Sequence, residues 1–413
     1  MKITHLSHSD SFGGAANFAL RIIDAGNSIG LESIFLVSSK KNSLKNTFII
    51  AQEGNRNINF IKAKLAQKSD RYLRKLEKTK IPMDKSANLI GSISARSINK
   101  SDSQIVHLHY IHGGLISIKQ IGKITKPIIW TMPDMWAFLG GEHYLTASDY
   151  DRYINGYVKD NRNNLDYGID ISKIIWNQKL KYFNNINLVA PSKWLAAQAS
   201  KSPLFIDRKI EIIAPPIDLE LFKPKNRIES RQNLSFANDD FVIGFLGGTQ
   251  IRKGWQFIYE LIEHSKTEKS WRFVLGGVGK SKYPKLDVKV LQLGTLQTST
   301  EILNFYSALD VLLVPSIQEA FGLVAQEAQA CGIPVVVFSE TGCSDIVNDK
   351  VTGFIVRERS TSELVKVLRQ LQSLDKTTLS KIRFESRQRA KNLWCKNVIA
   401  KKYEAEYLKI IKN

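Results

Sequence analysis

Short apolar runs alternate with segments of helical periodicity along the 413-residue chain, and this alternation constrains the fold more than any other feature. Strands that alternate with helices predict βαβ units and parallel sheets. The pattern is interrupted at 210–225, IEIIAPPIDLELFKPK, where three prolines indicate a linker. The sequence therefore predicts an α/β protein with two doubly wound, Rossmann-like domains that face a central cleft, with ligands beyond the carboxyl ends of the strands.

The expected domains are residues 1–214 and 215–394, followed by a terminal segment, 395–413. The last residues, NLWCKNVIAKKYEAEYLKIIKN, have the pattern of one long amphipathic helix. SDSFGGAAN is expected to be a loop and GGLISIKQIGKIT a helix. The predicted strands are KITHLS, SIFLVSS, IVHLHYIH, PIIWTM, INLVAPS, FVIGFLGG, WRFVLGG, VLLVPS and VVVFSE.

Basic residues are in large excess, with 59 Lys and Arg against 39 Asp and Glu, a net charge of +20. Nucleic acid, an anionic membrane surface or phosphate-bearing substrates could each explain this excess. No helix-turn-helix, RNP or zinc pattern accompanies the charge, so nucleic acid is not the expected partner. The three cysteines lack metal-ligand spacing, and no apolar run reaches about 18 residues. With no secretory pattern at the N-terminus, a cytoplasmic location is expected.

The basic excess is concentrated in 61–80, where eight basic residues accompany two acidic ones. Ile61, Leu65, Tyr72 and Leu76 recur there at helical spacing and share one face. A basic amphipathic helix suits an anionic membrane surface. The alternative, a solvated helix that packs its apolar stripe on the domain, remains open at this point.

The stretch PSIQEAFGLVAQEAQACGIPVV (315–336) places Glu319 and Glu327 in apolar company. Eight helical residues span about 12 Å, whereas the paired carboxyl groups of a glycosidase lie roughly 5–9.5 Å apart. The pair therefore suits the two ends of one extended ligand. A helix that starts near Phe321 and Gly322 would present the amides of Phe321, Gly322 and Leu323 to a phosphate or sugar. The plainer alternative is a first-turn glutamate followed by a solvated one.

The string P-S-x-x-E-A-F-G-L-x-x-x-E-A-x-A-x-G-x-P-V-V resembles the signature of the retaining glycosyltransferases of family 4, which have the GT-B fold. Three further segments resemble this family: SFGGAA, with Gly13 and Gly14; Arg252-Lys253-Gly254; and ETGCSDIVNDKVTGFIV (340–356). The resemblance covers nearly the whole chain. It also implies that the terminal helix crosses back onto the N-terminal domain.

The resemblance implies a role for each matched residue. Glu319 contacts the transferred sugar, Glu327 the ribose hydroxyls, and the backbone of 321–323 the sugar and phosphate. Arg252 and Lys253 clamp the diphosphate and supply the cationic charge that a metal supplies elsewhere, so neither a metal nor another cofactor is expected. The glycine loop with Gly13 and Gly14 also approaches the diphosphate. UDP- and GDP-sugars both remain open as donors.

IVHLHYIHGG and IIWTMPDMWAFLGGEHY resemble a subgroup of the family from bacterial surface-polysaccharide synthesis. Asp134 is the best candidate for an acceptor or active-site contact, followed by His109, His112 and Trp136. For each histidine, a structural hydrogen bond inside the fold is an equal alternative. The chain departs from the family pattern at three positions, where Pro133, Glu142 and Gly248 replace a common histidine, cysteine and arginine.

These features predict a retaining, metal-independent glycosyltransferase of the hexosyltransferase class. Its expected acceptor is a glycan, lipid-linked in the simplest case, at the inner face of the plasma membrane. The leaving diphosphate would help to deprotonate the acceptor while the protein holds charge and geometry. Two alternatives remain: a non-catalytic GT-B partner subunit, or a nucleotide-sugar epimerase or hydrolase of the same fold.

Overall fold

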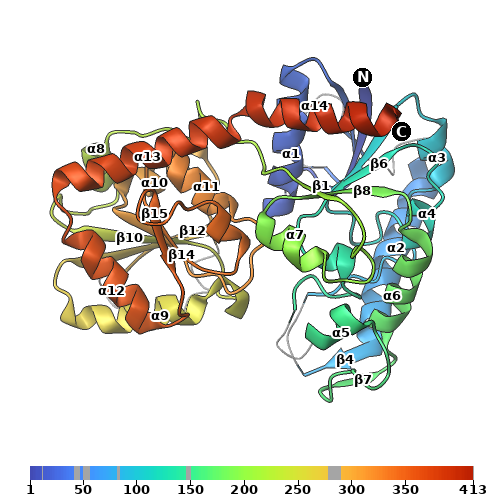
Figure 1. Ribbon diagram of the computed structural model, residues 1–413, viewed down its shortest axis with the longest axis horizontal. Coiled ribbons are helices and arrows are strands. Elements are labelled where there is room, and N and C mark those ends of the chain that lie inside the picture. The colour runs from blue at the N-terminus through green and yellow to red at the C-terminus, as the bar shows by residue number, and fades with distance from the viewer. Residues whose placement is uncertain are drawn as a thin grey trace. The chain divides into compact units, whose positions relative to one another are not determined.

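The computed structural model describes residues 1–11, 13–40, 47–49, 56–80, 84–145, 150–277 and 290–412. It divides into two compact units, Met1–Pro216 with Ile399–Asn413, and Ile217–Val398. Each unit contains a parallel sheet with helices packed against it (Figure 1). The predicted α/β class with two Rossmann-like units is confirmed.

The N-terminal sheet has the strand order β3-β2-β1-β5-β6-β8-β9, and each neighbouring pair is parallel. Residues 210–212 of the predicted linker pair with β8 as the edge strand β9, so the linker is shorter than predicted. The strands are β1 (Lys2–Ser9), β2 (Glu32–Ser39), β3 (Thr47–Ile49), β5 (Ile105–Leu108), β6 (Ile128–Thr131), β8 (Ile186–Ala190) and β9 (Ile210–Ile212).

The helices of this unit differ from the predictions at their ends. The predicted helix 113–125 is reduced to α4, because Gly113 and Gly114 have φ of +67° and +76° and cannot continue a right-handed helix. Helix α1 begins at Gly13, inside the predicted loop. The predicted helical segment 61–80 is wrong at its end, because 77–79 form strand β4 (Glu77–Thr79), which pairs with β7 (Asp166–Gly168).

The remaining elements of the N-terminal unit are α1 (Gly13–Ser28), α2 (Arg56–Leu76), β4 (Glu77–Thr79), α3 (Ala95–Lys100), α4 (Ile118–Ile121), η2 (Trp136–Phe138), α5 (Tyr150–Asn155), β7 (Asp166–Gly168), α6 (Ile171–Tyr182) and α7 (Lys193–Ala199).

The C-terminal sheet has the order β12-β11-β10-β13-β14-β15 and is parallel throughout. Its strands are β10 (Phe241–Leu246), β11 (Trp271–Gly276), β12 (Val290–Gly294), β13 (Val311–Val314), β14 (Val335–Phe338) and β15 (Gly353–Val356). Its helices are α8 (Arg227–Asn233), η4 (Ile251–Lys253), α9 (Trp255–His264), η5 (Ser265–Thr267), α10 (Ser299–Ala308), α11 (Leu323–Ala330), η7 (Gly342–Asp345), α12 (Thr361–Gln372) and α13 (Lys376–Trp394).

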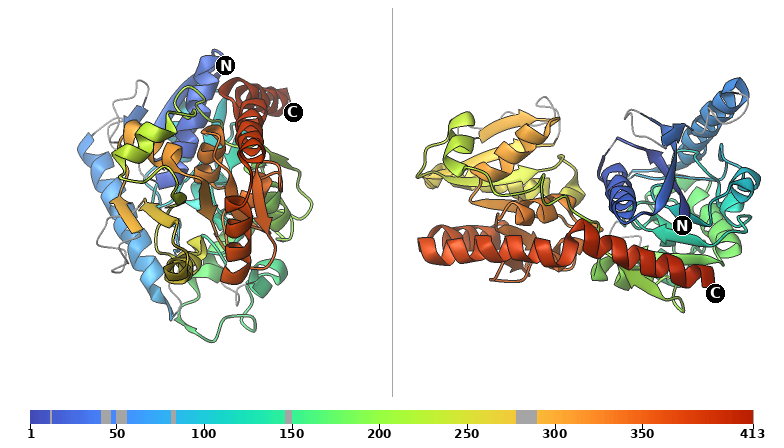
Figure 2. Two further views of the ribbon diagram at one scale, coloured as in Figure 1. Left: turned by 90° about the vertical axis from the view of Figure 1, so that its left-hand side faces the viewer. Right: turned by 90° about the horizontal axis from the view of Figure 1, so that it is seen from above.

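The chain ends in two helices, and the prediction of one continuous helix over 392–413 is wrong. Helix α13 stops at Trp394, and Cys395 takes an extended backbone conformation, with φ −60° and ψ 150°, before α14 (Lys396–Lys412) begins (Figure 2). The buried side of α14 belongs to the N-terminal core, where Ile399, Tyr403 and Tyr407 pack with Ile3. The terminal helix therefore returns to the N-terminal unit, as predicted.

Candidate functional site

Two loops at the carboxyl ends of β10 and β13 are joined in the C-terminal unit. Because β10 and β13 are neighbours, the turn that follows β10 lies beside the loop that follows β13. The carbonyl oxygen of Arg252 accepts hydrogen bonds from the amides of Ile317 (2.7 Å) and Gln318 (3.4 Å). Gly254 makes this approach possible, since its φ is +73° and a Cβ atom there would lie 1.8 Å from the Pro315 carbonyl oxygen.

The contact between the two loops brings Arg252 and Lys253, the predicted diphosphate-binding residues, next to Glu319, the predicted sugar-binding carboxylate. The Lys253 ammonium contacts the carboxylate of Glu319, and Arg252 Nη1 lies 3.7 Å from the same oxygen. Burial raises the pKa of Glu319, but the charges of Lys253 and Arg252 outweigh burial and hold that pKa below its usual value. Glu319 is therefore ionised at neutral pH, with two cations beside it.

The start of α11 offers backbone donors near these charges. The amides of Phe321, Gly322 and Leu323 make no hydrogen bond to another described residue. Gly322, with φ of +102°, turns the chain into the helix, and the carbonyl of Glu319 accepts a hydrogen bond from Gly342 at 2.8 Å. Unpaired amides at a helix N-terminus with lysine and arginine close by form an arrangement that binds anions such as phosphate.

Glu327 lies further along α11, where it is buried at 9% exposure. Its Oε2 accepts a hydrogen bond from the Tyr306 hydroxyl at 2.7 Å. Tyr306, on α10, was not among the predicted site residues, and nothing in the sequence around it distinguishes it from a core aromatic. A carboxylate fixed in this way can accept hydrogen bonds from a diol.

Gly13 and Gly14 lie at the N-terminus of α1, and both are exposed. A Cβ at Gly13 would meet no atom within 4 Å, so open space surrounds this turn. Phe12, which precedes Gly13 in the predicted glycine loop, lies outside the described residues. The two glycines are in the N-terminal unit, and the other predicted donor residues are in the C-terminal unit.

Asp134 and His112 meet in the N-terminal unit at the ends of β5 and β6. Asp134 accepts hydrogen bonds from His143 Nδ1 at 2.6 Å and from the Trp136 amide at 3.0 Å. His112 Nε2 lies 4.0 Å from the same carboxylate, and burial lowers the pKa of His112 well below its usual value. The Trp136 side chain is fully buried and donates to the Ser86 carbonyl at 2.8 Å.

His109 belongs to a second buried group. Its Nε2 lies 3.0 Å from His5 Nδ1, and its ring stacks on His107. Both ring nitrogens of His107 are occupied, by the hydroxyls of Tyr407 (2.7 Å) and Thr131 (2.8 Å). This group joins α14 to β1, β5 and β6, which matches the structural alternative for His109. An acceptor role for Asp134, His109, His112 and Trp136 stays a prediction.

Sequence reasoning missed His143 and Ser86, which complete a chain of hydrogen bonds. Ser86 Oγ lies 2.9 Å from His143 Nε2, so Ser86, His143 and Asp134 have the connectivity of a hydrolase triad. A triad also needs amide donors for an oxyanion. Here the amides of Ser86, Ala87 and Asn88 are bonded to Gly141 or to Asp70, and Ser86 is buried. The group therefore lacks the features of a nucleophilic site.

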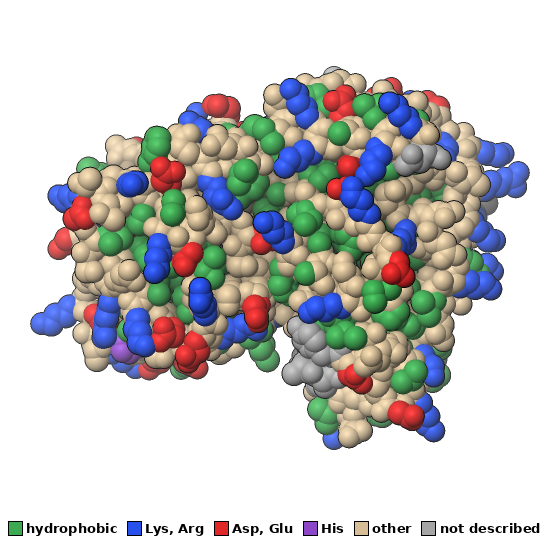
Figure 3. Space-filling model, in the orientation of Figure 1, with side chains coloured by type: hydrophobic (Ala, Val, Ile, Leu, Met, Phe, Trp, Pro, Cys, Tyr) green, Lys and Arg blue, Asp and Glu red, His purple; other side chains and the backbone are tan. Residues whose placement is uncertain are grey.

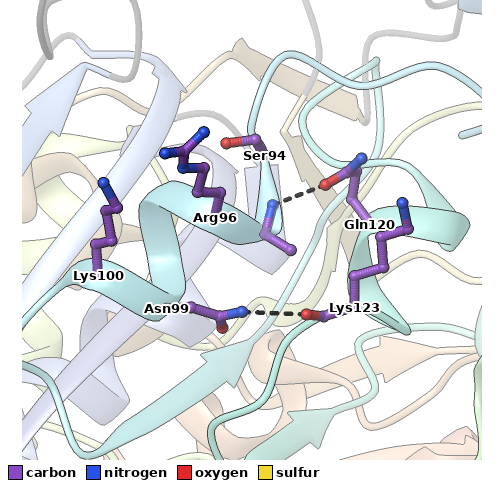
Figure 4. A pocket seen from close by; sticks show the side chains of 7 residues that line it. Ser94, Arg96, Asn99, Lys100, Gln120 and Lys123 are labelled. Carbon is purple, nitrogen blue, oxygen red and sulfur yellow. Dashed lines mark hydrogen bonds between the residues drawn. The ribbon is translucent and has the colours of Figure 1, made fainter.

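An open basic pocket of about 520 Å³ lies between α3 and α4 (Figure 4). The Ala95 amide bonds to Gln120 Oε1 (2.7 Å), and Asn99 Nδ2 bonds to the Lys123 carbonyl (3.1 Å). The charged ends of its three cations lie apart in Figure 4, so they form no convergent anion site. The lining consists of Ser94, Ala95, Arg96, Asn99, Lys100, Gln120 and Lys123.

Comparison with known proteins characterises the unit that holds Glu319. Residues 226–391 match the family Glycosyl transferases group 1. A curated relative, D-inositol 3-phosphate glycosyltransferase 1 of Catenulispora acidiphila, is 32% identical over 181 residues. That match covers 40% of this chain and 43% of the relative, so it spans less than half the length of either protein.

Solved structures extend the similarity to the whole fold. Sucrose-phosphate synthase from Thermosynechococcus elongatus gives a TM-score of 0.66 at 15% identity, covering 100% of this chain and 99% of that one. Anabaena Alr3699/HepE in complex with UDP and glucose gives 0.63 at 15% identity, covering 99% of each chain. The predicted GT-B fold is confirmed. The relative is named for an inositol phosphate, and the surface-polysaccharide subgroup stays a prediction.

Proposed function

We propose that the protein is a retaining glycosyltransferase that transfers a sugar from a UDP- or GDP-sugar to a glycan in surface-polysaccharide synthesis. The observation that carries this proposal is the group formed by Lys253, Arg252 and Glu319 beside unpaired amides of α11. It lies in the group 1 domain. The complex of HepE with UDP and glucose supports a nucleotide-sugar as the donor class.

The proposed chemistry relies on fixed charge. As the sugar leaves, negative charge grows on the diphosphate, and Lys253, Arg252 and the amides of 321–323 stabilise it. Glu319 positions the two cations and accepts hydrogen bonds from hydroxyl groups of the sugar. Since these cations supply the positive charge, no metal is proposed for the transfer step. The acceptor hydroxyl loses its proton to the leaving diphosphate on the same face of the sugar.

The donor is tested by thermal unfolding of the purified protein with UDP, GDP, ADP and their sugar conjugates. A ligand that binds the folded state raises the unfolding temperature with the logarithm of its concentration. Stabilisation by one nucleotide family, followed by sugar transfer from that donor, supports the proposal. Binding without transfer to any glycan would favour the non-catalytic partner, and donor turnover without acceptor would favour the hydrolase or epimerase.

Replacing Glu327 by glutamine should weaken nucleotide binding by about 10- to 150-fold, since a hydrogen bond to a charged acceptor is worth about 1.5–3 kcal/mol. Tyr306→Phe is the matched variant, because it removes the hydroxyl that holds Glu327 and keeps the ring. We expect a smaller loss for Tyr306→Phe. Isothermal titration with the stabilising nucleotide checks both. Unchanged affinity in Glu327→Gln would contradict the ribose assignment.

We also propose that α2 brings the enzyme to an anionic membrane surface. Of the apolar stripe, whose packing on the domain was one of two open alternatives, Ile61, Leu65 and Tyr72 are 56%, 57% and 65% accessible, and Leu76 is half-buried. The opposite face of α2 packs against the domain, where Asp70 accepts hydrogen bonds from the amides of Ala87 and Asn88. Exposed apolar side chains among exposed bases suit lipid head groups. Among the side chains of α2 that the structure describes, the exposed bases are Lys62, Lys64, Lys68, Arg71 and Lys75.

A pocket of about 290 Å³ between α2 and Ile90, which is 49% exposed, continues the apolar surface. Lys and Arg side chains are spread widely over the face shown in Figure 3, so the experiment needs a control for net charge. Among the described residues, no helix is long and apolar enough to cross a membrane.

Changing Lys68 and Lys75 together to glutamine should weaken binding to vesicles with anionic phospholipid by about 30-fold, at about 1 kcal/mol per basic residue near the surface. The control pair, Lys376→Gln with Lys381→Gln, makes the same charge change on exposed positions of α13. Vesicle sedimentation at fixed salt measures both. Equal losses of vesicle affinity for the two pairs would show that only net charge matters, and would contradict a specific role of α2.

A further inference from the structure

His112, Asp134 and His143 form a compact buried group at the ends of β5 and β6. Their side chains are almost fully inaccessible, and one ligand atom from each lies within 4.8 Å of the other two. His143 Nδ1 is 2.6 Å and His112 Nε2 is 4.0 Å from Asp134 Oδ2. Two imidazole nitrogens and a carboxylate oxygen therefore converge on one point inside the N-terminal unit.

His112 is not satisfied by the protein. Its Nδ1 is buried without a hydrogen-bond partner, and 4.0 Å between its Nε2 and Asp134 exceeds hydrogen-bond distance. Buried polar groups in native proteins nearly always have a partner, and leaving one without costs about 1–3 kcal/mol. Neither ring nitrogen of His112, a residue at 2% exposure, makes a hydrogen bond to another described residue, and Nε2 is the one that faces Asp134. A ligand on Nε2 would give that nitrogen a partner, while Nδ1 would keep the proton.

His143 and Asp134 each make a further hydrogen bond, on the side away from the proposed site, that holds the side chain in place, as metal ligands commonly do. The second nitrogen of His143 bonds to Ser86 Oγ at 2.9 Å, and the second oxygen of Asp134 accepts the Trp136 amide at 3.0 Å. Such outer hydrogen bonds fix the tautomer and the direction of a ligand. In the metal-free protein the proton on His143 Nδ1 is shared with Asp134, so metal binding displaces it. His143 then donates from Nε2 to Ser86, and its Nδ1 lone pair faces the same point as the Asp134 carboxylate.

We propose that His112 Nε2, Asp134 Oδ2 and His143 Nδ1 bind a divalent metal ion of the zinc class. Two imidazoles and one carboxylate suit Zn²⁺, with a fourth position left for water or another ligand. Tetrahedral zinc with bonds of about 2.0–2.1 Å needs ligand atoms about 3.3 Å apart, so each measured distance changes by about 0.7 Å.

The neighbouring buried cation is compatible with this ion. Lys179 donates to the backbone carbonyls of Trp136, Leu139 and Gly140, so its hydrogens are directed to the end of η2 and not to Asp134. The bound metal would join the loop after β5 to the loop after β6. It is separate from the donor chemistry, which lies on residues of the group 1 domain, so metal-independent transfer and this site are compatible.

The test uses the full chain, stripped with a chelator and titrated with ZnCl₂ against a competing chromophoric chelator. We expect one zinc per chain at this site and at least a tenfold loss of affinity in His112→Gln. His112→Gln breaks no side-chain hydrogen bond, so the metal-free variant should unfold near the wild-type temperature. His143→Gln should lose zinc as well, whereas His264→Gln, at the half-buried C-terminal end of α9 in the other unit, should keep it.

Two results would overturn the proposal. The first is the absence of zinc binding in wild type, which would assign a water to the space beside His112. The second is equal zinc affinity in wild type and His112→Gln, which would place any bound zinc elsewhere. Nucleotide binding by the metal-free protein is measured in parallel, so failure of the metal site and failure of the donor site are distinguished.

Discussion

Replacing Lys253 by methionine should lower kcat/KM for sugar transfer by about 10²–10³-fold, the loss seen when one donor to a developing oxyanion is removed. Methionine keeps the unbranched chain and removes the charge that contacts Glu319. The variant leaves the diphosphate with Arg252 and backbone donors alone. Steady-state kinetics with the stabilising nucleotide-sugar measure the loss, which should fall on kcat more than on KM.

The same substitution should shift the pH profile. Burial raises the pKa of Glu319, and the charges of Lys253 and Arg252 lower it. Of these two charges, Lys253 has the larger effect on that pKa. Without Lys253 the pKa of Glu319 rises, so the carboxylate is lost at a higher pH and the acidic limb of the activity profile moves upward. Lys253→Arg should restore part of the rate, and Lys223→Met, at an exposed lysine of the same unit, should leave it unchanged. Full activity in Lys253→Met would contradict the assignment.

Replacing Gly254 by alanine should destabilise the C-terminal unit by about 3 kcal/mol or more, the sum of a strained left-handed residue and an overpacked contact. The new Cβ would lie 1.8 Å from the Pro315 carbonyl oxygen. Moving that carbonyl away would break the hydrogen bonds that join the two loops at Arg252. At about 2–4 °C per kcal/mol, the unfolding temperature should fall by at least about 6 °C. Calorimetry of the full chain checks this, and transfer activity should fall with it.

Gly30→Ala separates the effect of backbone strain from the effect of the close contact with Pro315. Gly30 has a similar φ, +86°, but its Cβ would meet no atom within 4 Å. It should therefore cost only about 1–2 kcal/mol, the usual price of a left-handed L-residue. Equal losses in Gly30→Ala and Gly254→Ala would show that the contact with Pro315 contributes nothing.

Local patterns in the sequence identified most of the architecture. Apolar runs bounded by turns located nine strands of the two parallel sheets, and each overlaps an observed strand. The short or irregular elements were missed, because a three-residue edge strand such as β9 has too few residues to show a period. The break at Cys395 was also missed, since the amphipathic pattern continues through it. A contact distant in sequence accompanies the break: the Ile217 amide donates to the Trp394 carbonyl at 2.8 Å, and Ile217 forms a β-bridge with Cys395.

The sequence by itself determined the residue types of the proposed donor site, because Glu319, the amides of 321–323 and Glu327 lie on one continuous loop and helix. Only the tertiary structure decided their partners. Lys253 meets Glu319, 66 residues away, because β10 and β13 are neighbours in the sheet. Likewise His143 meets Ser86 across 57 residues, and Tyr407 meets His107 across 300. Such contacts have no local signature, since they arise from which strands pair and which helix covers them.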